Sequence, residues 1–178
     1  VNPRARALAA EWRESAADDA AVVRRDIDFF RGRRFEYPLH PPLLGRNSAD
    51  EFLFATKQGF CEHFASSFVF LMRAAGVPAR VITGYQGGDT NPVDGYMVVR
   101  QADAHAWAEV WLQDSGWTRV DPTAAAIPVR VELGITAAAP VGAPLLMRSG
   151  LDWLKSLRNN WDALTNQWNQ WVLGYNPE

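Results

Sequence analysis

The middle of the chain carries one helical stripe of apolar residues, followed by segments in which apolar and polar residues alternate. The stripe recurs at steps of three and four, at Phe64, Phe68, Leu71, Met72 and Ala75. Gly76 and Pro78 then supply residues that commonly end a helix. The pattern predicts a buried central helix that begins near Cys61.

Beyond this helix the period of the apolar pattern changes to two, which is typical of strands. Four segments with this alternation are separated by turn-forming residues, at 79–85, 95–101, 105–112 and 117–123. The Gly- and Asp-rich segment 87–95 between the first two predicts a hairpin tip. We therefore expect an α+β fold, with the central helix packed on an antiparallel sheet.

Further helices are predicted on both sides of this core. Residues 3–31 predict two helices, with Pro3 in a first turn and Gly32 as a stop. Ser48 with a glutamate three positions later predicts a capping box and a short helix through Phe54. Residues 150–173 predict an amphipathic helix rich in Trp, whose apolar face we expect to pack on the domain or its N-terminal helices.

The length of 178 residues fits one domain. We expect a single domain over 1–178, with these parts: N-terminal helices 3–31, a core of about 45–130, a covering segment 124–147 and a C-terminal helix 150–173. The first residue is Val1, and no signal-type apolar segment follows it, so we expect a fragment of a longer protein.

Charge and composition narrow the function. The net charge of −2 offers no basic field for a nucleic acid, and the arginines between 24 and 34 are typical of a solvated helix face. No apolar run approaches the roughly 18 residues that a membrane span needs. The single cysteine, Cys61, has no partner for an internal disulfide.

Cys61 is the first candidate for chemistry. The first turn of a helix lowers a thiol pKa, although a lone cysteine is more often a small buried apolar residue. A nucleophilic cysteine also needs a base and a group that orients the base. Among the three histidines, His63 leaves the same helix in another direction, His40 lies in a Pro-rich segment, and His105 begins a strand.

The orienting group is predicted by the parity of a hairpin. A tight turn joins the strands 105–112 and 117–123, and a register that pairs Glu109 with Arg119 puts Asp121 one diagonal step from His105 on one face. Asp103, two residues before His105, is the alternative. His105 and Asp121 share a face only if the residue numbers of each opposed pair in the hairpin add up to an even number, as they do for Glu109 and Arg119.

Metal and cofactor sites are not predicted. The order Cys-Glu-His at 61–63 lacks the spacing of zinc ligands, and segment 87–95 lacks the alternating carboxylates of a calcium loop. Phosphate-binding glycine motifs are absent from the sequence. We expect no cofactor.

Three blocks of sequence resemble the transglutaminase-like superfamily, in the order of its Cys, His and Asp segments. They are "GFCEHFASSFVFLMRAAGVPARVITGY", "DAHAWAEVWL" and "GWTRVDPT". The spacings between Cys61, His105 and Asp121 are compact, and the aromatic tail extends the likeness to most of the chain. The chain is most similar to the membrane-anchored TgpA-type proteins of Gram-negative bacteria.

The resemblance implies a papain-like fold and roles for individual residues. Cys61 is implied as nucleophile, His105 as base and Asp121 as orienting residue. An oxyanion needs aimed donors, for which we consider the Cys61 N–H and the Gln58 side chain. Trp107 and Tyr85 are candidates to line the acyl site, although aromatic residues on strands are more often core.

The implied reaction is acyl transfer from a glutamine carboxamide, through a Cys thioester, to a lysine-type amine. With water as acceptor the same residues would make a peptidase or amidase, and a catalytically silent scaffold domain is a third possibility. The resemblance further implies a protein or peptide substrate and a periplasmic domain that is joined to the membrane only through segments outside this sequence. We expect a monomer.

Overall fold

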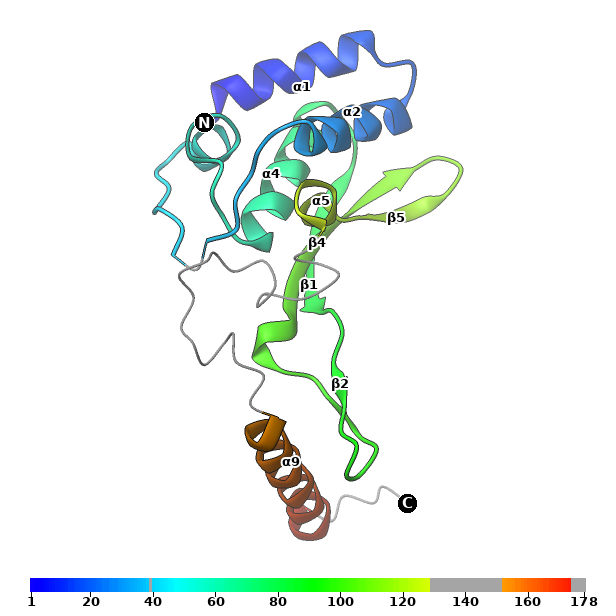
Figure 1. Cartoon of the computed structure of the whole chain (residues 1–178). Coiled ribbons are helices and arrows are strands. Elements are labelled where there is room, and N and C mark those ends of the chain that lie inside the picture. The colour runs from blue at the N-terminus through cyan, green and yellow to red at the C-terminus, as the bar shows by residue number, and fades with distance from the viewer. Residues whose placement is uncertain (39, 129–151, 174–178) are drawn as a thin grey trace.

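The computed structural model describes residues 1–38, 40–128 and 152–173. Helices and helical turns are α1 Pro3–Ser15, α2 Asp19–Arg31, α3 Ser48–Asp50, the π-helical turn η1 Glu51–Thr56, α4 Cys61–Ala74, the 3-10 turn η2 Gln101–Asp103, α5 Pro122–Ala126 and α9 Asp152–Leu173. Strands are β1 Ala79–Tyr85, β2 Asp89–Thr90, β3 Met97–Val98, β4 Ala104–Leu112 and β5 Gly116–Val120. Figure 1 shows α4 between the N-terminal helices and the strands.

Helix α4 forms the centre of the core, as its stripe predicts. The side chains of the stripe and those of β4 that face it are almost fully buried: Phe64, Phe68, Leu71, Met72, Ala75, Ala106, Ala108 and Val110. Burying each large apolar side chain contributes on the order of 1.5–3 kcal/mol. The core therefore fixes the position of α4 against β4, and with it the position of Cys61.

The main sheet is antiparallel and three-stranded, in the order β1-β4-β5. Strand β4 lies in the middle, with Gly84 of β1 opposite His105 on one side and Arg119 of β5 opposite Glu109 on the other. The strands predicted at 79–85, 105–112 and 117–123 are confirmed within a few residues. The observed α+β fold is the predicted one.

The fourth predicted strand, at 95–101, is wrong for the most part. Only Met97 and Val98 form a strand, and they pair with Asp89 and Thr90 in a separate two-stranded ribbon whose tip is the predicted turn. Most apolar side chains on this segment are exposed, Met97 by 66%, while Val98 is half-buried. Alternation alone does not place a strand in the main sheet when nothing packs on its apolar face.

The capping box predicted at Ser48 is also wrong. Asn47 occupies the N-cap position without a side-chain cap bond, and Glu51 accepts from the N–H of Gly45 instead. Asp50 caps a different helix: its carboxylate accepts from the N–H groups of Arg4 and Ala5 at 3.0 and 2.7 Å, in the first turn of α1. Helix N-termini favour such a carboxylate, whichever part of the chain supplies it.

The C-terminal helix forms, but its apolar face does not pack as expected. The described large apolar side chains on α9 are 56–71% exposed: Trp153, Leu157, Trp161, Leu164 and Trp168. The polar edge of α9 faces the β2–β3 ribbon instead. Arg100 donates to the Asp162 carboxylate at 2.9 Å, and the Asn91 side-chain amide donates to the Asn159 carbonyl at 2.8 Å. Figure 1 shows α9 beside that ribbon and apart from α1 and α2. Residues 129–147 of the expected covering segment and the side chains of Leu154 and Trp171 lie outside the described residues.

Candidate active site

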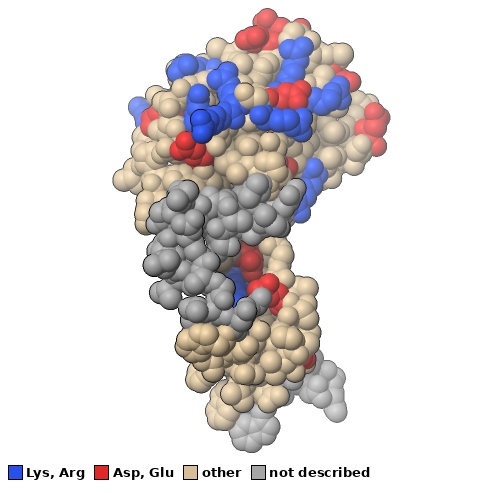
Figure 2. Space-filling model, viewed as in Figure 1, with Lys and Arg blue, Asp and Glu red and all other residues tan. Residues whose placement is uncertain are grey.

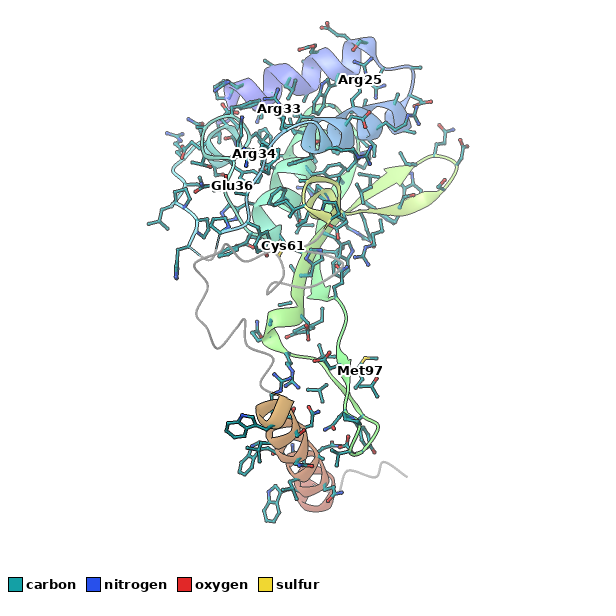
Figure 3. The ribbon with its side chains drawn as sticks, viewed as in Figure 1. Arg25, Arg33, Arg34, Glu36, Cys61 and Met97 are labelled. Carbon is teal, nitrogen blue, oxygen red and sulfur yellow. The ribbon has the colours of Figure 1, made fainter. Side chains whose placement is uncertain are left out.

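Cys61 is the first residue of α4 (Figure 3). Phe60 before it is extended, and the N–H of Phe60 donates to Nδ1 of His63 at 3.0 Å, so His63 bonds back along the chain. Gly59 is required here, because a Cβ would lie 2.8 Å from the His63 side chain. Cys61 is 8% exposed, and the dipole at the first turn of the helix favours the thiolate.

His105 lies near the start of β4 and is 4% exposed. Its Nε2 is 2.7 Å from Oδ2 of Asp121. The other ring nitrogen, Nδ1, is buried and has no partner of ordinary hydrogen-bond geometry within the described part of the chain. With Nε2 engaged, Nδ1 is the ring atom that can meet the thiol of Cys61.

Asp121 directly follows β5 and is held at both oxygens. Its Oδ1 accepts from the backbone N–H groups of Thr123 and Ala124, which caps α5, and its Oδ2 binds His105. The predicted register of Glu109 with Arg119 is confirmed, so the parity that puts His105 and Asp121 on one face is present. Asp103, the alternative, accepts from the N–H of Arg100 at 2.7 Å in the turn before β4.

The surroundings of Cys61 favour a thiolate. Burial of the thiol raises its pKa, but the neighbouring His105 imidazole with its positive charge, the Tyr37 hydroxyl and the backbone N–H of Ala106 outweigh it. The net effect lowers the pKa of Cys61 below its ordinary value. A thiol with a lowered pKa next to a histidine is the form that acts as a nucleophile.

The pKa of His105 is raised, whereas the pKa of Asp121 is lowered like that of Cys61. Burial lowers the pKa of His105, but the hydrogen bond to Asp121, the neighbouring Cys61 thiol and the negative charges of both residues raise it to about 9. Burial raises the pKa of Asp121, and the hydrogen bond and charge of His105 bring it below its ordinary value. All three shifts favour the charged forms, which are thiolate, imidazolium and carboxylate in a row.

Trp107 lies beside His105 on the same strand face. Its ring stacks with the imidazole at 6.2 Å between centroids, and Arg119 covers it at 4.4 Å. On β1, Gly84 leaves room for this ring, since a Cβ there would lie 2.9 Å from it. Tyr85 is 56% exposed at the end of β1. The role of Trp107 and Tyr85 in the acyl site stays a prediction.

Two other predicted residues have local partners. The Gln58 amide donates to the Glu36 carboxylate at 2.9 Å, and its role as an oxyanion donor stays a prediction. His40 is exposed. In the described residues no group of three or more His, Cys, Asp or Glu side chains could hold a metal ion, and no helix there is long and apolar enough to cross a membrane.

Sequence reasoning missed Tyr37. Its hydroxyl accepts from the N–H of Cys61 at 3.3 Å and helps to lower the pKa of the thiol, although Tyr37 lies 24 residues earlier in the chain. The contact depends on a parallel bridge between Glu36 and Gln58. In the sequence, Tyr37 is only a tyrosine in a Pro-rich extended segment, and this pattern does not predict which part of the fold the segment packs against.

Comparisons with known proteins identify the family of the chain. The transglutaminase-like superfamily profile matches residues 6–122. The chain is 46% identical over 185 residues to a protein-glutamine gamma-glutamyltransferase of Pseudomonas aeruginosa, covering 99% of this chain and 28% of that protein. It is 32% identical over 127 residues to the protein YebA of Bacillus subtilis, covering 67% of this chain and 17% of that protein.

The fold has a solved counterpart. The crystal structure of the periplasmic domain of TgpA from Pseudomonas aeruginosa matches with a TM-score of 0.71 and 50% identity, over 74% of this chain and 46% of that one. A structure of the same domain bound to ethylmercury matches with the same TM-score. This chain thus spans less than half of the solved domain and 28% of the curated relative. From the profile and the near full-length identity, the chain belongs to the transglutaminase-like superfamily.

Proposed function

We propose that this domain transfers the acyl group of a protein glutamine to a primary amine through a thioester on Cys61. The observation that carries the proposal is the buried row of Cys61, His105 and Asp121, in which Nε2 of the histidine is held at 2.7 Å by the aspartate. That bond leaves Nδ1 directed to the thiol side, and the pKa values of the thiol and the imidazole are shifted toward an ion pair. An ion pair of this kind is an activated nucleophile with its acid already in place.

In the acylation step the Cys61 sulfur attacks the carbonyl carbon of the glutamine side chain. The C–N bond breaks, and the proton of the His105 imidazolium goes to the departing nitrogen, which leaves as ammonia. A γ-glutamyl thioester and a neutral imidazole remain. Asp121 keeps the ring in one tautomer and orientation throughout.

In the second step a lysine-type amine attacks the thioester carbon. Its proton passes to His105, the C–S bond breaks, and an isopeptide bond forms while the thiolate and imidazolium are restored. Water in place of the amine would give hydrolysis from the same intermediate. The acyl-transfer assignment is supported by the likeness to the Pseudomonas aeruginosa protein-glutamine gamma-glutamyltransferase.

The setting of the reaction belongs to the same proposal. The likeness to the periplasmic domain of TgpA supports a single periplasmic domain that acts on protein or peptide substrates, as part of a membrane-anchored protein of a Gram-negative bacterium. We expect it to act as a monomer and without a cofactor, because the chemistry described uses only side chains of this chain.

The test is incorporation of a fluorescent primary amine into a glutamine-bearing protein, with ammonia release measured in parallel. We expect amine incorporation by the wild-type domain and none by Cys61→Ala. Ammonia release without amine incorporation would identify a hydrolase. Activity retained in Cys61→Ala would contradict the cysteine mechanism altogether.

A further inference from the structure

Tyr37 is placed at the nucleophile by backbone pairing. The N–H of Glu36 donates to the Lys57 carbonyl at 2.9 Å, and the N–H of Gly59 donates to the Glu36 carbonyl at 3.2 Å. These bonds fix the segment that contains Tyr37 beside the one that leads into α4. The Tyr37 side chain is 8% exposed, and its ring packs edge-on against Phe60 at 5.4 Å.

The Tyr37 hydroxyl makes two contacts with Cys61. Its oxygen accepts from the backbone N–H of Cys61 at 3.3 Å, and the hydroxyl lies next to the thiol, whose pKa it lowers. The hydroxyl that accepts from the amide also carries a proton, which it can donate to a neighbouring anion. A hydroxyl that accepts one hydrogen bond is polarised and becomes a better donor of another.

The contacts of Tyr37 change which group can donate a hydrogen bond to the oxyanion. The Cys61 N–H, which is the natural backbone donor, already donates to Tyr37, and the Gln58 amide donates to Glu36. The oxyanion of the tetrahedral intermediate forms on the carbon bonded to sulfur, so it lies close to any donor that contacts the sulfur. During attack the negative charge leaves the sulfur for that oxygen.

We propose that the Tyr37 hydroxyl is the side-chain donor that stabilises this oxyanion, turning its proton from the thiolate to the oxyanion as the C–S bond forms. This inference rests on the proposed acyl transfer. It makes Tyr37 a catalytic residue, polarised by the Cys61 amide, and it needs only a rotation of the hydroxyl. Preorganised donors of this kind need little rearrangement during the reaction.

The test compares two reactions of the same thiol in Tyr37→Phe. Acyl transfer passes through an oxyanion, whereas alkylation by iodoacetamide displaces iodide at a saturated carbon and forms none. We expect kcat for amine incorporation to fall roughly 10²–10³-fold, the loss typical of one oxyanion donor, with little change in KM. The limiting alkylation rate at high pH should change less than about threefold, since the thiolate is then fully formed.

Tyr96→Phe is the matched control, because Tyr96 is 51% exposed in the turn of the β2–β3 ribbon, outside the active site, and the variant should keep its full kcat. A kcat within about threefold of wild type in Tyr37→Phe would overturn the inference. An equal loss in acyl transfer and in limiting alkylation would also overturn it, because Tyr37 would then act on the thiolate or the fold alone.

A glutamine-side-chain aldehyde peptide gives a second readout that needs no turnover. It forms a hemithioacetal with Cys61, whose oxygen occupies the oxyanion position, so its affinity should weaken in Tyr37→Phe while the affinity of the substrate amide does not. Unchanged aldehyde affinity would contradict the inference. Full activity of Tyr37→Phe with an inactive Cys61→Ala would overturn only this inference and leave the proposed function standing.

Discussion

His105 is the residue on which the charge state of the site depends. Its pKa is raised to about 9 by Asp121 and Cys61 in spite of burial, so the imidazolium persists well above neutral pH. The lowered pKa of Cys61 depends in turn on that positive charge. The two groups therefore titrate as a pair.

The pair predicts a pH profile for wild type and for two histidine variants. The midpoint of wild-type Cys61 alkylation should lie below the ordinary thiol value of about 8.5, because the pKa of Cys61 is lowered. Acyl transfer should decline as the pH rises through about 9, where His105 loses the proton that the leaving amine needs. In His105→Ala the alkylation midpoint should move upward and acyl transfer should be lost.

His63→Ala is the control for this profile, because His63 bonds to the N–H of Phe60 and not to the thiol. Iodoacetamide rates across pH 5–10 and amine incorporation measure both effects. A larger loss in His63→Ala than in His105→Ala would show that the base is misassigned.

Asp26 is a second buried ionisable residue, away from this chemistry. It is fully buried on α2, both carboxylate oxygens lack a hydrogen-bond partner within the described residues, and burial raises its pKa well above the ordinary value. The folded protein thus binds this proton more tightly than the unfolded chain does. The free energy of unfolding should fall as the pH rises from about 4 toward the folded pKa of Asp26.

Asp26→Asn removes this titration. The variant should gain stability relative to wild type as the pH increases, measured by urea unfolding between pH 4 and 8. Asp28→Asn, an exposed position on the same helix, should show no such trend. A stability difference between Asp26→Asn and wild type that does not change with pH would contradict the prediction.

At the scale of elements, the β4–β5 hairpin decides which aspartate reaches His105. The alternation of β4 and the tight turn predicted Asp121 from sequence, because parity leaves only two choices of face. The contact of Tyr37 with Cys61 could not be predicted in this way, since it depends on a parallel bridge between segments that no periodicity connects.

Asp121→Asn tests the hairpin assignment. The amide keeps an acceptor for the N–H groups of Thr123 and Ala124, so the cap of α5 and the thermal stability should change little. It cannot stabilise the imidazolium, so kcat should fall on the order of 10³- to 10⁴-fold. Asp103→Asn, which alters only the turn before β4, should stay active. The reverse order of losses would transfer the orienting role to Asp103.

At the scale of the whole molecule, the apolar pattern predicts the core well and the tail poorly. The stripe of α4 is buried on all sides because β4, β1 and the N-terminal helices enclose it. The stripe of α9 has the same periodicity but is exposed, because polar contacts with the ribbon orient the helix. Periodicity gives the face of a helix, and long-range partners decide where that face points.

Positive and negative side chains are mixed on the surface formed by α1 and α2. Figure 2 shows basic and acidic side chains interspersed over the end of the molecule that α1 and α2 form. Several of these arginines pair with aspartates of the same region, such as Arg13 with Asp19 and Arg31 with Asp28. Arg24, Arg25 and Arg31 lie exposed on α2, as the sequence predicted, whereas Arg33 and Arg34 lie exposed beyond the end of that helix.

The docking of α9 depends on polar contacts that salt should weaken. Arg100 pairs with Asp162 at 2.9 Å, with both side chains about one-quarter exposed, and Asn166 contacts Asp94 at 3.3 Å. Partly exposed ion pairs contribute roughly 1 kcal/mol or less and are screened by salt. Arg100→Gln should therefore speed amide hydrogen exchange in α9 several-fold and reduce its sensitivity to salt, while exchange in α4 stays unchanged.

Arg158→Gln is the matched control, because Arg158 is exposed on the same helix and its loss changes the charge equally. It should leave exchange in α9 close to wild type. Mass spectrometry of peptides from 152–173 and 61–74 measures both regions in one experiment. Equal exchange in wild type and Arg100→Gln would mean that the ion pair does not hold the helix, and faster exchange in α4 would mean that the change reaches the core.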